Sequence, residues 1–248
     1  MLSKSQISFV KSLHQKKVRK DLGLFIVEGI KSVTEFLQSD YVVDTIFYTT
    51  KEALKLGILS QNVKLFEIKD EDLLKISTLK RPQQVLAIIR VPTYSIAPKF
   101  ELPSNTFTLM LDNIQDPGNL GTIIRTADWF GFKQLICSMN TVEAYNPKVV
   151  QASMGSLSRV HIIYADLPSL LQNYKLPIYG AFLNGESINQ TDFPDAGVLI
   201  LGNEGTGISE AVSQHINYPI TIPRYGKAES LNVAISAAIF CIKIKKDL

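Results

Sequence analysis

The second half of the sequence alternates short, largely apolar runs with helical patterns, and this alternation constrains the fold more strongly than any other feature. Strands are expected at residues 106–111, 134–137, 161–164, 178–181, 198–201 and 220–222. Helices are expected between them, at residues 119–130, 149–157, 167–173 and 231–244. Strands that are apolar on both faces favour a parallel sheet covered by helices on both sides. Ligands of such sheets bind beyond the carboxyl ends of the strands, so we look for a site in the loops after Leu111, Leu201 and Ile222.

Residues 1–92 predict a second, smaller α/β domain. Short apolar runs have the pattern of strands at residues 24–27, 42–48, 63–68 and 84–90, and helices are expected at residues 28–38, 51–56 and 70–76. Three prolines follow, Pro92, Pro98 and Pro103, and prolines so close together exclude a helix or a central strand. We therefore expect an extended linker at residues 93–105 and the larger domain at residues 106–248.

Composition excludes several classes of protein. With 46% hydrophobic and 20% charged residues, the chain is neither disordered nor fibrous. The two cysteines, Cys137 and Cys241, lie in apolar runs, as expected of core residues in a reducing compartment. There is no C-x-x-C or H-E-x-x-H motif, so nothing in the sequence supports a metal site. No apolar run is long enough to span a membrane, and we expect a cytoplasmic protein.

Basic side chains gather toward the N-terminal end. Residues 1–92 contain 15 lysines and arginines against 10 acidic residues, whereas residues 93–248 contain 11 against 13. The first 20 residues contain no acid and six basic side chains: Lys4, Lys11, Lys16, Lys17, Arg19 and Lys20. Such local density suits a polyanion, because phosphate contacts depend on nearby charge more than on net charge. A solvated helix with surplus lysines would look similar, so nucleic-acid binding and this plainer alternative both stay open.

The first unusual loop follows Leu111 and leads into a helix. Pro117 and Gly118 form a turn, and Asn119 is expected to cap the helix. The apolar residues that recur at helical spacing, and should be buried, are Leu120, Ile123, Ile124 and Ala127. Arg125 falls off this stripe, so it is either a solvated surface arginine or a fixed cation on the side that leads back to the loop.

A glycine-rich loop follows the apolar run at residues 198–201. Its sequence, Gly-Asn-Glu-Gly-Thr-Gly at residues 202–207, combines three glycines with one carboxylate. Glycine lets a ligand approach the backbone closely and permits positive φ angles. The loop matches neither the G-x-G-x-x-G of dinucleotide-binding folds nor a phosphate loop that ends in Gly-Lys-Ser/Thr. By itself it fits a ligand site and a purely structural loop equally well.

The third loop joins Ile222 to the last helix. Ser230 is placed to cap that helix, and Asn232 is expected to lie in its first turn. A capping role alone would account for Ser230. Asn232 in a nearly all-apolar helix is harder to explain in this way, because a buried amide needs polar partners.

Together the three loops resemble the motifs of the SpoU family of RNA 2′-O-ribose methyltransferases, part of the SPOUT superfamily. The family's first motif is an Asn followed six residues later by Arg-Thr-Ala, which matches Asn119 and residues 125–127. The second matches the glycine-rich loop at residues 202–207. The third matches Ile-Pro at residues 222–223 and Ser-Leu-Asn at residues 230–232. Residues 25–29, Phe-Ile-Val-Glu-Gly, and the basic segment before them look like the family's substrate-binding domain, which is related to a small RNA-binding ribosomal-protein fold.

The resemblance implies a fold, a cofactor and partners. The C-terminal domain is expected to be a parallel-sheet SPOUT domain with a deep trefoil knot. Its loops are expected to bind S-adenosyl-L-methionine, mainly through backbone groups at Gly202, Ile222 and Leu231. The family also implies a homodimer with the last helix in the interface, which would cover the apolar run at residues 233–242. RNA is the implied substrate, ribosomal rather than transfer RNA, and neither a membrane nor a metal is an expected partner.

By resemblance the catalytic residues are Arg125, Asn119, Glu204, Ser230 and Asn232. The methyl donor is a sulfonium and already electrophilic, so the protein has to position the ribose hydroxyl and let its proton leave. A guanidinium hardly ever loses its proton, so we expect Arg125 to clamp a phosphate and to stabilise the forming alkoxide rather than to act as the base. The other four residues would hold the substrate and the loops, and the final proton acceptor stays open.

Two other functions fit parts of the sequence. A catalytically silent RNA-binding module would keep the fold and the basic residues 1–92, and a cofactor titration would distinguish it from an enzyme. A Rossmann-type enzyme would use residues 202–207 for a dinucleotide. Its glycine fingerprint should then follow the first strand of the domain, and the loop after Leu111 does not fit that fingerprint.

Overall fold

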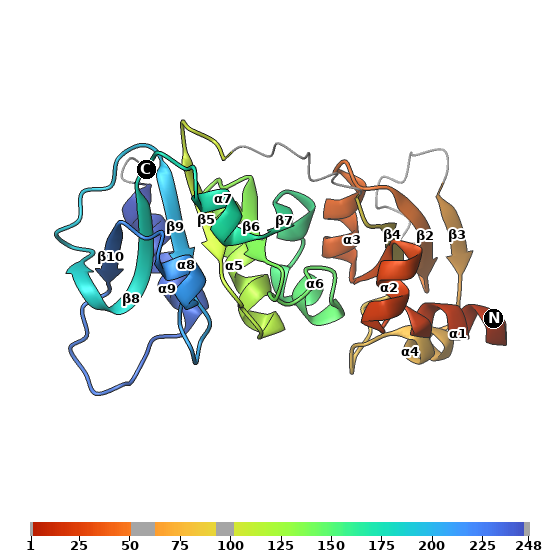
Figure 1. Cartoon of the computed structure of the whole chain (residues 1–248). Helices are drawn as coiled ribbons and strands as arrows, with labels where there is room; N and C mark the ends of the chain where they lie inside the picture. Colours follow the sequence, from red (N-terminus) through yellow and green to blue (C-terminus); the bar gives the residue numbers. More distant parts are fainter. Residues whose placement is uncertain (1, 51–62, 93–101, 246–248) are drawn as a thin grey trace. The chain divides into compact units, whose positions relative to one another are not determined.

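The computed structural model describes residues 2–50, 63–92 and 102–245, which form two compact units (Figure 1). Unit 1 consists of Met1–Thr93 and Glu143–Arg159, and unit 2 of Tyr94–Val142 and Val160–Leu248. The helix expected at residues 51–56 and most of the linker expected at residues 93–105 lie outside the described residues.

Unit 1 is built on a four-stranded sheet in the order β1-β4-β2-β3. Its strands are β1 (Leu24–Glu28), β2 (Val43–Tyr48), β3 (Lys64–Glu67) and β4 (Val85–Arg90). Strand β4 runs antiparallel to both β1 and β2, and β2 pairs with β3 in parallel. The helices that accompany this sheet are α1 (Lys4–Ser12), α2 (Lys16–Leu22), α3 (Ile30–Leu37), α4 (Asp70–Ile76) and α6 (Pro147–Ser153), with a short 3-10 turn, η2 (Ser156–Ser158). The four expected strands are confirmed to within one residue at each end.

The helix expected at residues 149–157 is interrupted. Helix α6 ends at Ser153, and the chain then passes through Met154 and Gly155, which have φ angles of 50° and 94°. Two successive left-handed residues cannot continue a right-handed helix, so the last turn becomes the separate η2.

A buried arginine joins the two sequence segments of unit 1. Only 2% of Arg19 is exposed, and its Nε and Nη2 atoms donate to the carboxylate oxygens of Glu143 at 3.1 and 2.8 Å. Its Nη1 atom donates to the carbonyl oxygens of Leu13 and His14, both at 2.9 Å. The prediction that Arg19 is one of the basic residues suited to a polyanion is wrong, because its guanidinium is already bound to an internal carboxylate and two carbonyls.

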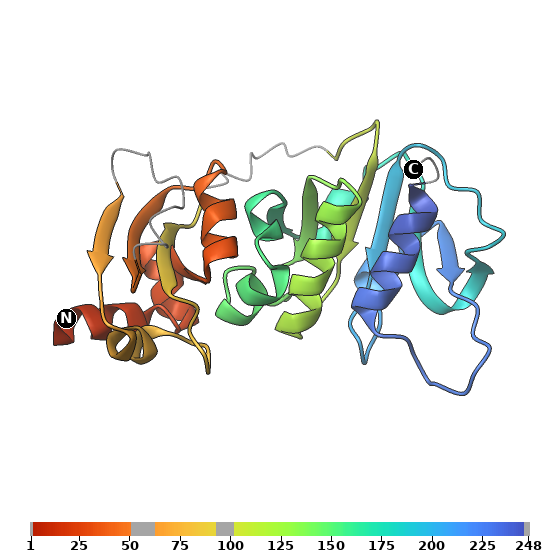
Figure 2. The same ribbon diagram turned by 180° about the vertical axis from the view of Figure 1, so that it is seen from behind.

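Unit 2 contains a six-stranded, wholly parallel sheet in the order β10-β8-β9-β5-β6-β7. Its strands are β5 (Phe107–Leu111), β6 (Gln134–Ser138), β7 (His161–Ala165), β8 (Ile178–Ser187), β9 (Gly197–Leu201) and β10 (Tyr218–Thr221). Two helices, α7 (Leu167–Leu171) and α8 (Glu210–Ser213), lie on the face seen in Figure 1. The other face, seen in Figure 2, carries α5 (Pro117–Trp129) and α9 (Val233–Ile244), which pack against each other. The expected parallel α/β domain and the smaller α/β domain are confirmed, and the trefoil knot stays a prediction.

The middle of the unit 2 sheet is fully buried. Every residue of β5 and β9 is buried, including the single polar one, Thr108. The predicted stripe of α5 is also fully buried, with an exposure of 0% at Leu120, Ile123, Ile124 and Ala127. Cys137 and Cys241 are core residues, as expected. Burial raises the pKa of the Cys137 thiol, and that of Cys241 to about 12, so both stay protonated at neutral pH and neither serves as a nucleophile. Among the helices of the described residues, none is long and apolar enough to cross a membrane.

Replacing Arg19 tests the link within unit 1. In Arg19→Ala the carboxylate of Glu143 loses the guanidinium that donates two hydrogen bonds to it. We expect the unfolding free energy of the full chain, measured by urea titration, to fall by roughly 3–5 kcal/mol. The matched control is Lys64→Ala, which removes an exposed ion pair with Asp44 at 3.8 Å and should cost less than about 1 kcal/mol. Equal losses in the two variants would show that the buried pair contributes nothing special.

Candidate active site

The N-cap of helix α5 lies three residues earlier than expected. Asp116 is the N-cap, because its Oδ1 atom accepts from the backbone N–H of Asn119 at 2.8 Å. Pro117 occupies the first helical position, where its missing N–H costs nothing. The prediction that Asn119 caps this helix is therefore wrong. Asn119 lies in the first turn, and its side chain reaches other loops instead.

The glycine-rich loop after β9 is folded back on itself. Asn203 and Gly207 exchange two backbone hydrogen bonds of 2.9 and 3.0 Å, and the Asn203 side-chain oxygen accepts from the N–H groups of Gly205 and Thr206. A Cβ atom on Gly202 would lie 2.3 Å from the carbonyl carbon of Gly207. The loop itself therefore requires glycine at position 202, whether or not a ligand also approaches there.

Helix α9 is capped by Asn232. The Asn232 Oδ1 atom accepts from the backbone N–H groups of Ala234 at 2.9 Å and Ile235 at 3.3 Å. The expectations that Ser230 caps this helix and that Asn232 lies inside its first turn are both wrong. Asparagine is as good a cap as serine, and the helix begins two residues later than expected, at Val233, so the cap falls on Asn232.

Three of the predicted site residues form a continuous chain of hydrogen bonds. The Asn119 Nδ2 atom donates to Glu204 Oε1 at 2.6 Å, and the Asn232 Nδ2 atom donates to Asn119 Oδ1 at 2.9 Å. These residues follow β5, β9 and β10 in the sequence, so the loops leaving three strands of one sheet meet at the Asn119 amide. Glu204 and Asn232 are exposed and Asn119 is half-buried, which leaves the cluster open to a ligand.

The other predicted site residues lie further along α5, directly before Asn232, or directly after β10. Arg125 is exposed on α5, six residues after Asn119, which corresponds to about 9 Å along the helix axis. Ser230 and Leu231 immediately precede Asn232, and Leu231 is 45% exposed. Ile222 directly follows β10, which is separated from β9 by β8 in the sheet.

Two residues that the sequence motifs do not include, Asp112 and Asn113, hold the loops of the site together. Asp112, only 4% exposed, donates its backbone N–H to the Leu201 carbonyl and accepts from the Ser209 N–H, both at 2.8 Å. Asn113 adopts a φ of 60°, and its carbonyl accepts from the Asn203 side chain at 2.8 Å. These contacts join the loops after β5 and β9. The sequence signal that could have pointed to Asp112 is a carboxylate placed directly after a largely apolar strand.

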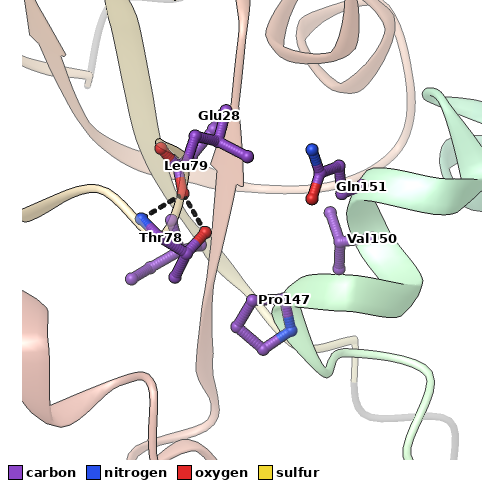
Figure 3. A pocket seen from close by; sticks show the side chains of 7 residues that line it. Glu28, Thr78, Leu79, Pro147, Val150 and Gln151 are labelled. Atoms are coloured by element: carbon purple, nitrogen blue, oxygen red, sulfur yellow. Dashed lines mark hydrogen bonds between the residues drawn. The ribbon is translucent and has the colours of Figure 1, made fainter. Parts of the chain in front are cut away.

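A separate pocket lies within unit 1, lined by Ile26, Glu28, Thr78, Leu79, Pro147, Val150 and Gln151 (Figure 3). The Glu28 carboxylate accepts from the Thr78 backbone N–H at 2.9 Å and from the hydroxyls of Thr78 and Ser77. Next to it Gly29 has a φ of 93°, and a Cβ there would lie 2.6 Å from Gln83 Oε1. The Glu-Gly pair therefore holds the turn before β4, and this carboxylate has a structural role. Within the described part of the chain, no three His, Cys, Asp or Glu residues are grouped as a metal site would need.

Comparison with known proteins gives a family match in each half of the chain. The profile of the SpoU rRNA Methylase family matches residues 106–242, which include the three loops described above, and the profile of the MRM3-like substrate binding domain matches residues 4–87. The chain belongs to the SpoU rRNA methylase family. The resemblance seen in the three sequence motifs is thereby confirmed.

Individual relatives match this chain over nearly its whole length. The 23S rRNA guanosine 2′-O-methyltransferase RlmP of Bacillus subtilis is 31% identical, over 95% of this chain and 94% of its own. A solved structure of a TrmH-family protein from Porphyromonas gingivalis is 38% identical, with a TM-score of 0.88 and 99% of both chains covered. The AdoMet-bound rRNA methyltransferase from Sinorhizobium meliloti is 27% identical, with a TM-score of 0.88, and covers 99% of this chain and 96% of its own.

The identity of the α9 cap can be tested by stability. Asn232→Ala removes both the cap and the bond to Asn119, and we expect a loss of about 0.5–2 kcal/mol in unfolding free energy by urea titration. Ser230→Ala, two residues away and exposed, should leave the unfolding midpoint nearly unchanged. A larger loss in Ser230→Ala than in Asn232→Ala would contradict the assignment.

Proposed function

We propose that the protein transfers a methyl group from S-adenosyl-L-methionine to a ribose 2′-hydroxyl of ribosomal RNA. The observation that carries this proposal is the hydrogen-bonded chain Glu204–Asn119–Asn232, which unites one residue from each of the three family motifs. The names of RlmP and of the Sinorhizobium meliloti enzyme support ribosomal RNA as the substrate class and S-adenosylmethionine as the donor.

The residues present fit the cofactor. We assign its binding to the backbone at Gly202, Ile222 and Leu231, which lie after β9, after β10 and before α9. Loops at the carboxyl ends of parallel strands offer main-chain groups to a polar ligand, and the 45% exposed side chain of Leu231 offers apolar surface to a flat ring. When bound, S-adenosylmethionine supplies a methyl group on a positively charged sulfur that is already electrophilic.

The chain's own residues then have to orient the ribose and let its proton leave. Arg125 is proposed to bind the phosphate next to the reacting ribose and to stabilise the negative charge that grows on the 2′-oxygen, since its guanidinium stays protonated. Asn119, Glu204 and Asn232 hold the three loops together through their hydrogen bonds. Ser230 is proposed to contact the substrate beside them. Bound S-adenosyl-L-methionine would supply its methyl group to the 2′-oxygen that these residues hold, and the hydroxyl proton would leave that oxygen as the methyl group is taken up.

Residues 1–92 are proposed to bind the RNA, and residues 106–248 to carry out the transfer. Five of the six basic residues in the first 20 are exposed, which leaves Lys4, Lys11, Lys16, Lys17 and Lys20 for phosphate contacts. The turn held by Glu28 adds two exposed cations, Lys80 and Arg81, on a backbone already fixed by hydrogen bonds. With ribosomal RNA as substrate, we propose the cytoplasm as the place of action.

A homodimer is proposed through α9, in a SPOUT domain with a knotted C-terminal region. Ile235 and Ile242 are 52% and 62% exposed, and seven residues apart they share one face of the helix. Two large apolar side chains on one exposed face favour cover by a second copy of the helix.

The function is tested by incubating the purified protein with tritiated S-adenosylmethionine and total RNA from cells that lack it. We expect label in ribosomal RNA, and mapping of the labelled position should give a 2′-O-methylated ribose. Label on a base, or none in RNA while the cofactor binds in calorimetry, would reject the proposal.

Arg125→Ala should reduce methyl transfer at least about 100-fold, because the charge that stabilises the 2′-oxygen is lost. Cofactor affinity by calorimetry and the mass of the oligomer by light scattering should stay as in the wild type. Arg125→Lys keeps the charge without the two-pronged geometry and should retain part of the activity. Full activity in Arg125→Ala would remove this residue from the mechanism.

Ile242→Glu should convert a dimer into monomers, because an unpaired carboxylate would be buried in the interface. The matched control is Leu74→Glu on α4, a 58% exposed apolar residue outside α9, which should leave the mass unchanged. Sedimentation equilibrium measures both. A wild-type protein that is monomeric at micromolar concentration would end the dimer proposal.

A further inference from the structure

The loop between β10 and α9 carries an unusually exposed aromatic side chain. Tyr225 is 94% exposed, more than any other large hydrophobic residue in the described part of the chain. In both ribbon views the loop projects away from the sheet of unit 2 (Figures 1 and 2). A ring in this position packs against almost nothing in its own protein.

The loop is nevertheless shaped by hydrogen bonds. Arg224 Nη1 donates to the Ala228 carbonyl at 3.1 Å, which closes a turn around Tyr225 and Lys227. At the start of the loop, Thr221 Oγ1 donates to the Leu183 carbonyl at 3.0 Å, and at its end Asn232 is bonded to Asn119. Tyr225 is therefore presented at the tip of a turn whose two ends are anchored.

Position and chemistry together favour RNA as the partner of this turn. Tyr225 is seven residues from Asn232, so an extended chain could separate the two by about 25 Å at most, a span of a few nucleotides. Unpaired bases stack on aromatic side chains, and adjacent cations bind the neighbouring phosphates. Two cations, Arg224 and Lys227, flank Tyr225.

We propose that Tyr225 stacks on an unpaired base within a few nucleotides of the methylated ribose, and that Lys227 binds a phosphate of the same strand. This inference depends on the proposed function and adds a specificity to it. The substrate must be single-stranded next to the target, because a base inside a duplex has no face to offer the ring.

Methyl-transfer kinetics test the stacking. Tyr225→Ala should raise the KM for RNA about ten-fold, the loss expected for one stacked base, whereas Tyr225→Phe keeps the ring and should stay near the wild type. Cofactor affinity should be the same in all three proteins. Lys227→Ala should make the affinity for RNA less sensitive to salt. The slope of log affinity against log salt concentration should decrease in magnitude by about one.

Fluorescence gives a direct reading of the contact, since Trp129 is the only tryptophan. In a Trp129→Phe protein, Tyr225→Trp places a reporter at the tip and Leu183→Trp a control reporter at a residue that is 69% exposed. We expect an RNA fragment of about a dozen nucleotides around the mapped ribose to quench the first reporter and not the second.

Three results would overturn the inference while leaving the proposed function intact. They are an unchanged KM in Tyr225→Ala, equal quenching of both reporters, and a monomeric Tyr225→Ala protein, which would assign the ring to contact with a second copy. If the wild-type protein methylates no RNA at all, it is the proposed function that fails.

Discussion

The arrangement of the active-site loops depends on one side-chain amide, that of Asn119. Its nitrogen donates to Glu204 and its oxygen accepts from Asn232, so both ends of a short side chain are used at once. Neither an aspartate nor an apolar residue could do this, because the first has no donor and the second has neither group. The amide is held in place because the buried stripe of α5 packs the helix against the sheet. Two loops far apart in sequence are thereby placed relative to a rigid helix.

Much of the site is built before any ligand arrives. The loop after β9 is folded by Asn203, which bonds to its own loop and to Asn113 in the loop after β5, and Asp112 bonds to Ser209. Gly202 is required by the approach of its own backbone to that of Gly207. Preorganised loops of this kind lower the entropy cost of binding a flexible cofactor and of orienting a ribose for attack.

The chain crosses between the two units at more than one place in the sequence. Residues Glu143–Arg159 follow β6 and precede β7 in the sequence, yet they belong to unit 1. Glu143 binds Arg19, Arg159 pairs with Glu35, and the Tyr145 ring packs against Phe25 at 4.7 Å between ring centroids. The chain therefore passes between the units three times, so the smaller unit is completed by a segment of the larger domain's sequence.

The sequence by itself determined where the strands lie, apart from the last six residues of β8, and it also gave the buried stripe of α5 and the three family motifs. These depend on runs of apolar residues or on fixed spacing, which are local properties of the chain. Only the tertiary structure decided which residue caps each helix. The sequence offers two suitable caps two or three residues apart in each case, Asp116 or Asn119 for α5 and Ser230 or Asn232 for α9. It also decided that Arg19 is buried and that Glu143–Arg159 belongs to unit 1. Those outcomes rest on contacts between residues more than a hundred positions apart, and no local pattern encodes such a contact.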